Sequence, residues 1–207
     1  VELMLYGTPV KTKDFSFDLT INMAHNLSEV VELTPEKKEV IFNEGESNFI
    51  IDVGAREGGK LGDIYPIQSY KRDNNGNIII RDGYPLIEES KGNDRKAIGN
   101  IQPKLLMSVT PSFAYKGIYL TALFDMKFGG DIVSMSESVA TNYGMAKRTE
   151  NRGTITVKGV NEDGTPNTTA VDAESYYKRI ANVAEEFLYD ASFIKLKELS
   201  LGYSFPK

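Results

Sequence analysis

The chain has 207 residues, of which 41% are hydrophobic and 26% are charged, and this is the composition of an ordinary folded protein. Its formal net charge is −5 and its basic residues are scattered, which argues against a nucleic-acid partner. The absence of cysteine excludes disulfides, thiolate metal ligands and cysteine nucleophiles.

Residues 15–23 predict a strand with two unlike faces. Every odd position from Phe15 to Met23 is apolar and every even position is polar, which is the period of two that a strand imposes on its side chains. We therefore expect one face of a sheet to carry the polar set Ser16, Asp18, Thr20 and Asn22.

A shorter strand-like stretch precedes this strand. Leu3 and Leu5 are apolar at the same spacing of two, and Gly7-Thr8-Pro9 follows with residues that are typical of a turn. We therefore expect a hairpin whose turn lies at Gly7-Thr8-Pro9.

The next segment, from about residue 25 to residue 99, predicts a long loop because Asn, Gly, Asp and Lys are frequent in it. Short hairpins are expected within this loop. The best turn signal is Asn75-Gly76, which lies between Tyr70 and the apolar run Ile78-Ile79-Ile80.

Residues 104–128 carry the strongest pattern. Apolar side chains occupy odd positions up to Tyr115 and even positions from Ile118 onward, so the parity changes at Lys116-Gly117. A tight hairpin requires this change if both strands are to keep their apolar side chains on one face. Each arm has about 11 or 12 residues, close to the length that crosses a bilayer at a tilt. The opposite face includes Asp125 and Lys127.

After Gly129-Gly130 the chain has loop composition again, to about residue 170. Residues 172–188 then predict a short helix, because Asp172 can act as the N-cap and apolar residues recur at spacings of three and four. We expect this helix to lie within the second long loop.

The last alternating stretch runs from Phe193 to Phe205. Its alternation slips at Lys197-Glu198, which predicts a β-bulge. Because the sequence starts at Val1 without a leader and stops directly after a strand-like pattern, we expect a fragment of a longer protein.

Short turns and long loops alternate along these strands. Outer-membrane barrels have short periplasmic turns and long extracellular loops, whereas compact soluble domains seldom tolerate two connections of this length. The pattern therefore favours an all-β fold, namely an antiparallel transmembrane β-barrel segment with long extracellular loops and one short loop helix. A secreted or surface-anchored β-sandwich that binds glycans without transport is the alternative, because its strands alternate in the same way.

Three stretches of the sequence also carry a family pattern. The first is residues 53–65, around Arg56-Glu57-Gly58. The second starts at Ile98-Gly99-Asn100 and continues to Phe128-Gly129-Gly130-Asp131, and the third is residues 189–206. Their order and spacing resemble the C-terminal half of SusC/RagA TonB-linked outer-membrane proteins. The chain departs from the family at Gly59, where proline is common, and at Pro66, where glycine is usual.

The resemblance implies that residues 1–207 form part of a barrel domain of about 22 strands, without its plug domain and terminal strands. It implies an importer of the cell outer membrane that takes up glycans or peptides. The partners that it implies are a SusD-like surface lipoprotein, outer-membrane lipid and, through the absent plug, the TonB-ExbB-ExbD complex.

Two sets of side chains are candidates for function within this reading. If the apolar face meets lipid, the polar face lines the barrel lumen, and this predicts lumen-facing positions at Ser16, Asp18, Thr20, Asn22, Asp125 and Lys127. Tyr65, Tyr70 and Tyr84 are weaker candidates for contact with substrate or with the lipoprotein lid. Packing within the loop is the alternative interpretation of these tyrosines.

The sequence indicates no catalytic residue, no metal site and no cofactor. His25 is the only histidine and has no carboxylate cluster beside it. Glu88-Glu89 and Glu185-Glu186 are adjacent pairs, whereas glycoside hydrolysis needs two carboxylates about 5 to 10 Å apart across a cleft. We read both pairs as solvated charge, and a hydrolase is the most remote alternative.

Overall fold

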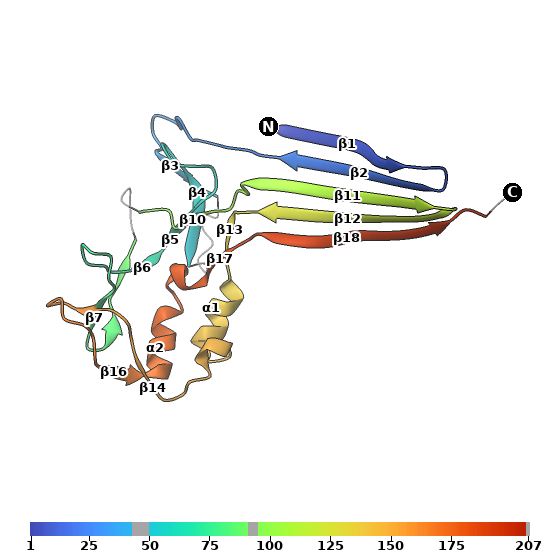
Figure 1. Ribbon diagram of the computed structural model, residues 1–207. Coiled ribbons are helices and arrows are strands. Elements are labelled where there is room, and N and C mark those ends of the chain that lie inside the picture. The colour runs from blue at the N-terminus through green and yellow to red at the C-terminus, as the bar shows by residue number, and fades with distance from the viewer. Residues whose placement is uncertain (43–49, 91–94, 206–207) are drawn as a thin grey trace. The chain divides into compact units, whose positions relative to one another are not determined.

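The computed structural model describes residues 1–42, 50–90 and 95–205 (Figure 1). The chain divides into two compact units. The strand unit comprises residues 1–28, 102–131 and 190 onward, and the loop unit comprises residues 29–101 and 132–189. Each unit is therefore assembled from segments that are far apart in the sequence.

The strand unit is one antiparallel sheet in the order β1-β2-β11-β12-β18, and its five strands lie side by side in Figure 1. Each strand has 10 or 11 residues, which is enough to cross a bilayer at a tilt. The strands predicted from the alternation are confirmed. Their bounds are β1 Glu2–Lys11, β2 Phe15–Ala24, β11 Leu105–Tyr115, β12 Ile118–Phe128 and β18 Phe193–Tyr203.

The hairpin between β11 and β12 turns at Lys116 and Gly117, as predicted. Tyr115 pairs with Ile118, and both turn residues have positive φ, 44° at Lys116 and 87° at Gly117. Such a two-residue turn matches the right-handed twist of the strands that it joins. A Cβ atom at Gly117 would lie 2.9 Å from the backbone oxygen of Ser204, so the turn requires glycine for space as well as for φ.

The turn predicted at Gly7-Thr8-Pro9 is wrong. These residues lie inside β1, whose register on β2 shifts between Gly7 and Val10, and the chain reverses later, where Thr12 N donates to Phe15 O at 2.8 Å. β1 is an edge strand of the described sheet, and a register shift there accommodates Pro9, which has no N–H to donate. Residues whose composition is typical of a turn thus form an irregular part of a strand here.

The bulge predicted at Lys197-Glu198 is confirmed. Leu123 of β12 pairs with Glu198, and Phe124 pairs with Leu196, so Lys197 is the extra residue. Past Phe193, the apolar residues of β18 lie at even positions before the bulge and at odd positions after it. Because of the extra residue, both sets lie on the same face as the apolar side chains of β12.

The loop unit has regular structure and its own hydrophobic core, which corrects the prediction of irregular loops. One core cluster joins Ile50, Ala184 and Phe187, and a second joins Tyr70, Ile180 and Val183. The apolar residues of this core are dispersed among polar ones, so no periodic pattern in the sequence predicted which of them are buried.

The strands of this part of the chain are short. They are β3 Glu39–Ile41, β4 Ile51–Arg56, β5 Asp63–Pro66, β6 Gln68–Tyr70, β7 Ile79–Arg81, β8 Tyr84–Pro85, β9 Ile87–Glu89, β10 Gly99–Asn100, β13 Asp131–Val133, β14 Thr154–Thr156, β15 Val160–Asn161, β16 Ala170–Asp172 and β17 Leu188–Asp190.

The turn predicted at Asn75-Gly76 is confirmed. The backbones of Arg72 and Ile78 form an isolated antiparallel β-bridge, and Gly76 N donates to Asp73 O at 3.0 Å. Asp73 also accepts hydrogen bonds from the backbone N–H groups of Asn75 and Asn77 at 2.9 and 2.8 Å, which fixes the turn.

The predicted helix is present but shorter than expected. Helix α2 spans Ala173–Ile180, and Asp172 caps it by accepting from Ser175 N at 2.8 Å. A short 3₁₀ turn at Ala184–Phe187 follows. Val183, before it, belongs to the second core cluster, and Phe187, at its end, belongs to the first.

A second helix was missed. Helix α1 spans Met135–Asn142, and its N-cap Ser134 accepts from Glu137 N at 3.3 Å. Ser-x-x-Glu is a known helix-start pattern and was the available signal. A further 3₁₀ turn spans Lys147–Thr149.

Candidate functional site

The side chains predicted to face a lumen share one face of the strand unit. Cross-strand pairing places Asn22 beside Ser108, and Ser108 beside Asp125. Because side chains alternate between the two faces, the remaining candidates fall on this same face, namely Ser16, Asp18, Thr20 and Lys127. We call it the polar face. That it lines a lumen stays a prediction.

Polar groups on this face bond across neighbouring strands. Asp18 Oδ1 accepts from Thr8 Oγ1 at 2.6 Å and from the Tyr6 hydroxyl at 3.4 Å. Lys197 Nζ, at the bulge, lies 3.3 Å from Asp125 Oδ2. Charged and hydroxyl groups are costly to place in hydrocarbon, so this face belongs against water or other protein.

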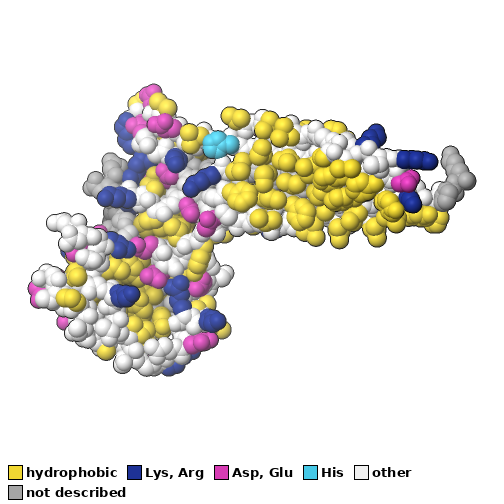
Figure 2. Space-filling view, in the orientation of Figure 1, with side chains coloured by type: hydrophobic (Ala, Val, Ile, Leu, Met, Phe, Trp, Pro, Cys, Tyr) yellow, Lys and Arg dark blue, Asp and Glu magenta, His cyan; other side chains and the backbone are white. Residues whose placement is uncertain are grey.

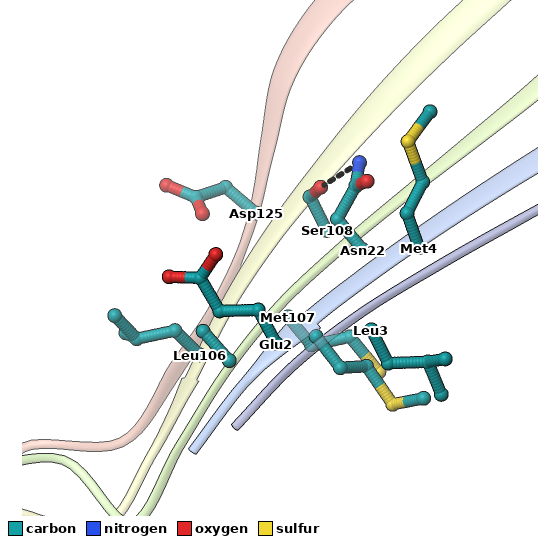
Figure 3. A pocket seen from close by; sticks show the side chains of 10 residues that line it. Glu2, Leu3, Met4, Asn22, Leu106, Met107, Ser108 and Asp125 are labelled. Carbon is teal, nitrogen blue, oxygen red and sulfur yellow. Dashed lines mark hydrogen bonds between the residues drawn. The ribbon is translucent and has the colours of Figure 1, made fainter. Parts of the chain in front are cut away.

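A hollow of about 530 Å³ lies on the sheet at the end from which the long connections leave. Figure 3 shows the carboxylates of Glu2 and Asp125 on the same side of the strands as Asn22, whose amide donates to Ser108 Oγ at 3.2 Å. Met4 extends from this side as well. The hollow offers hydrogen-bond acceptors to a bound hydroxyl or ammonium group and contains no nucleophile with an adjacent base.

Sequence reasoning found Asn22 and Asp125 but missed Glu2 and Met4. The N-terminal stretch was read only from its apolar members Leu3 and Leu5. The even positions of β1 include Met4 and Tyr6, so the stretch lacks a clean contrast between the two faces.

The opposite face of the sheet is apolar and open. Phe17 and Phe113, which pair across β2 and β11, stack with their ring centroids 4.8 Å apart. Large apolar side chains along β18 are widely exposed, with Leu199 at 64% and Leu201 at 75%. Figure 2 shows hydrophobic side chains covering the strands as a continuous surface. An apolar surface of this extent is a site of contact with a membrane or another protein.

Buried hydrophobic side chains occur only in the loop unit, among the residues that the structure describes. Its fully buried members include Ile64, Ile80 and Phe187. The described part of the strand unit is a single-layered sheet, so it has no hydrophobic core of its own. Its apolar face needs an apolar medium, as the lipid-facing side of a barrel wall does.

Two of the three candidate tyrosines are buried in the loop unit. Tyr65 is 3% exposed, and the guanidinium of Arg56 lies 4.8 Å from its ring centroid. Tyr70 is 5% exposed, and its hydroxyl donates to Glu186 Oε1 at 2.8 Å. Burial raises the pKa of the Tyr70 phenol, and the negative charge of Glu186 raises it further. Neither ring offers a free face in this structure.

Tyr84 is half-buried, and its ring lies 5.8 Å from the guanidinium of Arg179. Its hydroxyl makes no hydrogen bond with the residues that the structure describes. Contact of Tyr84 with substrate or lid stays a prediction.

The reading of Glu185-Glu186 as solvated charge is wrong. Glu185 accepts from the backbone N–H of Tyr70 at 3.1 Å and pairs with Arg72 at 2.7 Å. Glu186 pairs with Arg148 at 3.1 Å, in addition to its bond with the Tyr70 hydroxyl. The two carboxylates therefore hold one buried tyrosine in place, and their role is structural.

The family-like stretches meet one another inside each unit. In the loop unit, Asp63 of the first stretch accepts from Asn100 Nδ2 of the second at 2.7 Å. In the strand unit, Ser192 Oγ of the third stretch accepts from Gly129 N of the second at 2.7 Å. These short sequence patterns thus correspond to contacts that fix the ends of strands.

No group of three or more His, Cys, Asp or Glu side chains suited to a metal ion occurs within residues 1–42, 50–90 and 95–205. His25 Nδ1 lies 2.5 Å from the backbone oxygen of Lys104, which joins two strand ends of the strand unit. Within the same described ranges, no helix is both long and apolar enough to span a membrane.

Comparisons with known proteins agree with this geometry. The chain aligns over 99% of its length with the RagAB peptide importer in its closed-closed state, with a TM-score of 0.61 at 19% identity, and with the RagAB peptide transporter, with a TM-score of 0.56 at 18% identity. It covers 22% of each of those chains. In sequence it is 23% identical, over 99% of its length, to the TonB-dependent receptor SusC of Bacteroides thetaiotaomicron. The chain therefore resembles the SusC/RagA receptors in sequence, and its antiparallel β fold is similar to part of the RagAB chains.

A further relative of this SusC/RagA-like segment is the TonB-dependent receptor P3 of Formosa agariphila, which is 24% identical over the whole chain. The segment spans about a fifth of the length of these curated relatives, 21% for P3 and 20% for SusC. No family model matches it. The receptors that the chain resembles are outer-membrane proteins.

Proposed function

We propose that the chain forms part of the wall and outer loops of an outer-membrane importer that takes up nutrients by TonB-dependent active transport. The observation that carries the proposal is the strand unit, whose strands are long enough to cross a bilayer and whose two faces differ in polarity. In this role the apolar face contacts lipid, and the polar face lines the lumen with Ser16, Asp18, Thr20, Asn22, Asp125 and Lys127. The chain itself performs no chemical reaction.

The partners and the cargo belong to the same proposal. A SusD-like surface lipoprotein covers the barrel mouth, and the TonB-ExbB-ExbD complex supplies energy through a plug domain elsewhere in the full-length protein. The cargo is an oligosaccharide or a peptide. Relatives named as SusC and as a RagAB peptide importer support import as the shared activity. A β-sandwich that only binds glycans is less well supported, because the described strand unit has no buried core.

Uptake by the full-length protein tests the proposal. The gene is deleted in its host, and growth is measured on single oligosaccharides and on peptides as sole carbon sources, with plasmid-borne wild-type protein as the control. We expect a growth defect on one substrate class that the wild-type protein restores only when TonB is functional. Equal growth of deletion and wild-type strains on both classes would contradict an importer.

The membrane role has a separate test. Residues 1–207 are produced alone in aqueous buffer, and their association state and unfolding are measured. We expect aggregation without detergent, because the apolar face is exposed. A monomeric product that unfolds cooperatively in buffer would contradict the barrel-wall assignment.

A further inference from the structure

A second hollow, of about 380 Å³, lies wholly within the loop unit. It is formed where the end of helix α1 and the following turn approach the start of helix α2. Its size falls within the range of small-molecule sites. We call it the α1–α2 pocket. The residues that line it are Thr141, Asn142, Tyr143, Gly144, Thr149, Asn151, Arg152, Asp172, Glu174, Tyr177 and Lys178.

The end of helix α1 sets an aromatic ring on the rim of this pocket. Met145 N donates to Ala140 O at 2.7 Å and Gly144 N donates to Thr141 O at 3.1 Å, which is the Schellman pattern, with Gly144 at φ 68°. This cap places Tyr143 at the end of the helix, where the residue is 72% exposed. An exposed tyrosine beside a pocket offers a rigid apolar face to a ligand.

Polar groups beside this ring have hydrogen-bonding capacity to spare. Arg152 Nη2 donates to Gly144 O at 2.7 Å, and the other guanidinium N–H groups have no acceptor among the described residues. The side-chain amide of Asn142 and the hydroxyls of Tyr143 and Tyr177 also make no hydrogen bond there. Thr141 is fully buried at the same pocket, and its hydroxyl has no hydrogen-bond partner among the described residues. These groups line the same pocket, so they can bond a ligand that carries several hydroxyls.

The charges of the pocket compensate one another. Glu174 pairs with Lys178 at 2.7 Å, and the Asp172 carboxylate is held by Ser175 N. Hydrogen bonds from Ser175 keep the pKa of Asp172 below its usual value, so this carboxylate stays ionised and balances Arg152. A pocket without net charge favours a neutral ligand over an anion or a cation.

We propose that the α1–α2 pocket binds one ring of a neutral oligosaccharide, with the Tyr143 ring against its apolar face and Arg152, Asn142 and Tyr177 bonded to its hydroxyls. The proposal assigns a subsite on the loop unit and does not depend on whether the full-length protein transports its ligand. A peptide is the competing ligand, and it is an outcome of the test.

The full-length receptor in detergent tests the proposal. Binding is measured by saturation-transfer NMR and calorimetry, with a panel of neutral oligosaccharides of increasing length and a matched panel of short peptides. We expect at least one neutral oligosaccharide to bind, and Tyr143→Ala and Arg152→Ala each to raise its Kd about tenfold. Tyr143→Phe keeps the ring and should raise the Kd less than Tyr143→Ala.

Met145→Ala is the matched control, because Met145 follows in the same cap, is 81% exposed and does not line the pocket. It should leave the Kd unchanged. Thermal unfolding of each variant shows whether the loop unit remains folded. If Tyr143→Phe binds and Tyr143→Ala does not, while both remain folded, the loss of affinity comes from loss of the ring. Absence of oligosaccharide binding, equal binding by Tyr143→Ala and wild type, or peptide binding that depends on Tyr143 would overturn the proposal. A receptor that fails the uptake test but binds sugar through Tyr143 would leave it intact.

Discussion

Asn100 donates its side-chain amide to Asp63 at 2.7 Å, and the two residues also pair through the backbones of β10 and β5. Asp63 is only 8% exposed and further accepts from Lys60 N at 2.8 Å. This contact joins two stretches of the sequence that resemble the SusC/RagA family, so the pattern that carries the resemblance corresponds to a structural contact in the loop unit.

Removing this contact should destabilise the loop unit. Asn100→Ala leaves the buried Asp63 carboxylate without one of its donors, and we expect a loss of about 1 to 3 kcal/mol in the free energy of unfolding. Hydrogen exchange of backbone amides in the full-length protein measures the loss locally. Asn74→Ala is the control, because Asn74 is exposed and its side chain makes no bond in the described structure. Equal protection in both variants would argue against the role given to Asn100.

The β11–β12 turn should not tolerate a side chain at Gly117. Gly117→Ala combines a positive φ with a Cβ atom 2.9 Å from Ser204 O, and we expect a cost of about 1 to 2 kcal/mol. The folded fraction is measured by the shift in electrophoretic mobility that barrels show on heating. Gly202→Ala has open space around the added carbon and serves as the control. The assignment fails if the two variants fold equally well.

A charge on the apolar face should lower the stability of the protein in a membrane. Leu199 lies in the middle of β18 and is 64% exposed, and Leu199→Lys should cost about 2 to 4 kcal/mol in a bilayer. Ser200→Lys places the same charge one residue along, on the polar face, and should cost much less. Denaturant unfolding in lipid vesicles compares the two variants. Equal stability would show that the exposed apolar face does not meet lipid.

The stability of the loop unit should fall at alkaline pH through Tyr70. The folded protein raises the pKa of this phenol above its ordinary value of 10.0, mainly by burial and then by the charge of Glu186. Since the folded form holds the proton more tightly than the unfolded form, the stabilisation is complete below the unfolded pKa and is lost as pH rises above it. Hydrogen exchange between neutral and alkaline pH should show this loss in the wild type.

Tyr70→Phe should abolish most of that alkaline loss, and it should lower stability at neutral pH by about 1 to 2 kcal/mol because Glu186 loses a donor. Tyr84→Phe is the control, since the Tyr84 hydroxyl makes no hydrogen bond with described residues. An unchanged pH profile in Tyr70→Phe would remove Tyr70 as the cause.

The sequence by itself determined the strands of the wall. Alternation located β2, β11, β12 and β18, because a strand that separates two media must repeat with a period of two, and the parity change at Lys116-Gly117 located a turn. The slip at Lys197 likewise predicted the bulge. Composition failed at Gly7-Thr8-Pro9, since the same residues suit a turn and an irregular edge strand.

Only the tertiary structure decided the loop unit and its hollows. The partners of Tyr70 include Glu185 and Glu186, more than 100 residues away along the chain, and no local pattern predicts such a contact. For the same reason, the α1–α2 pocket was invisible in the sequence. It depends on the cap that turns Tyr143 outward and on the packing of two helices that a long connection separates.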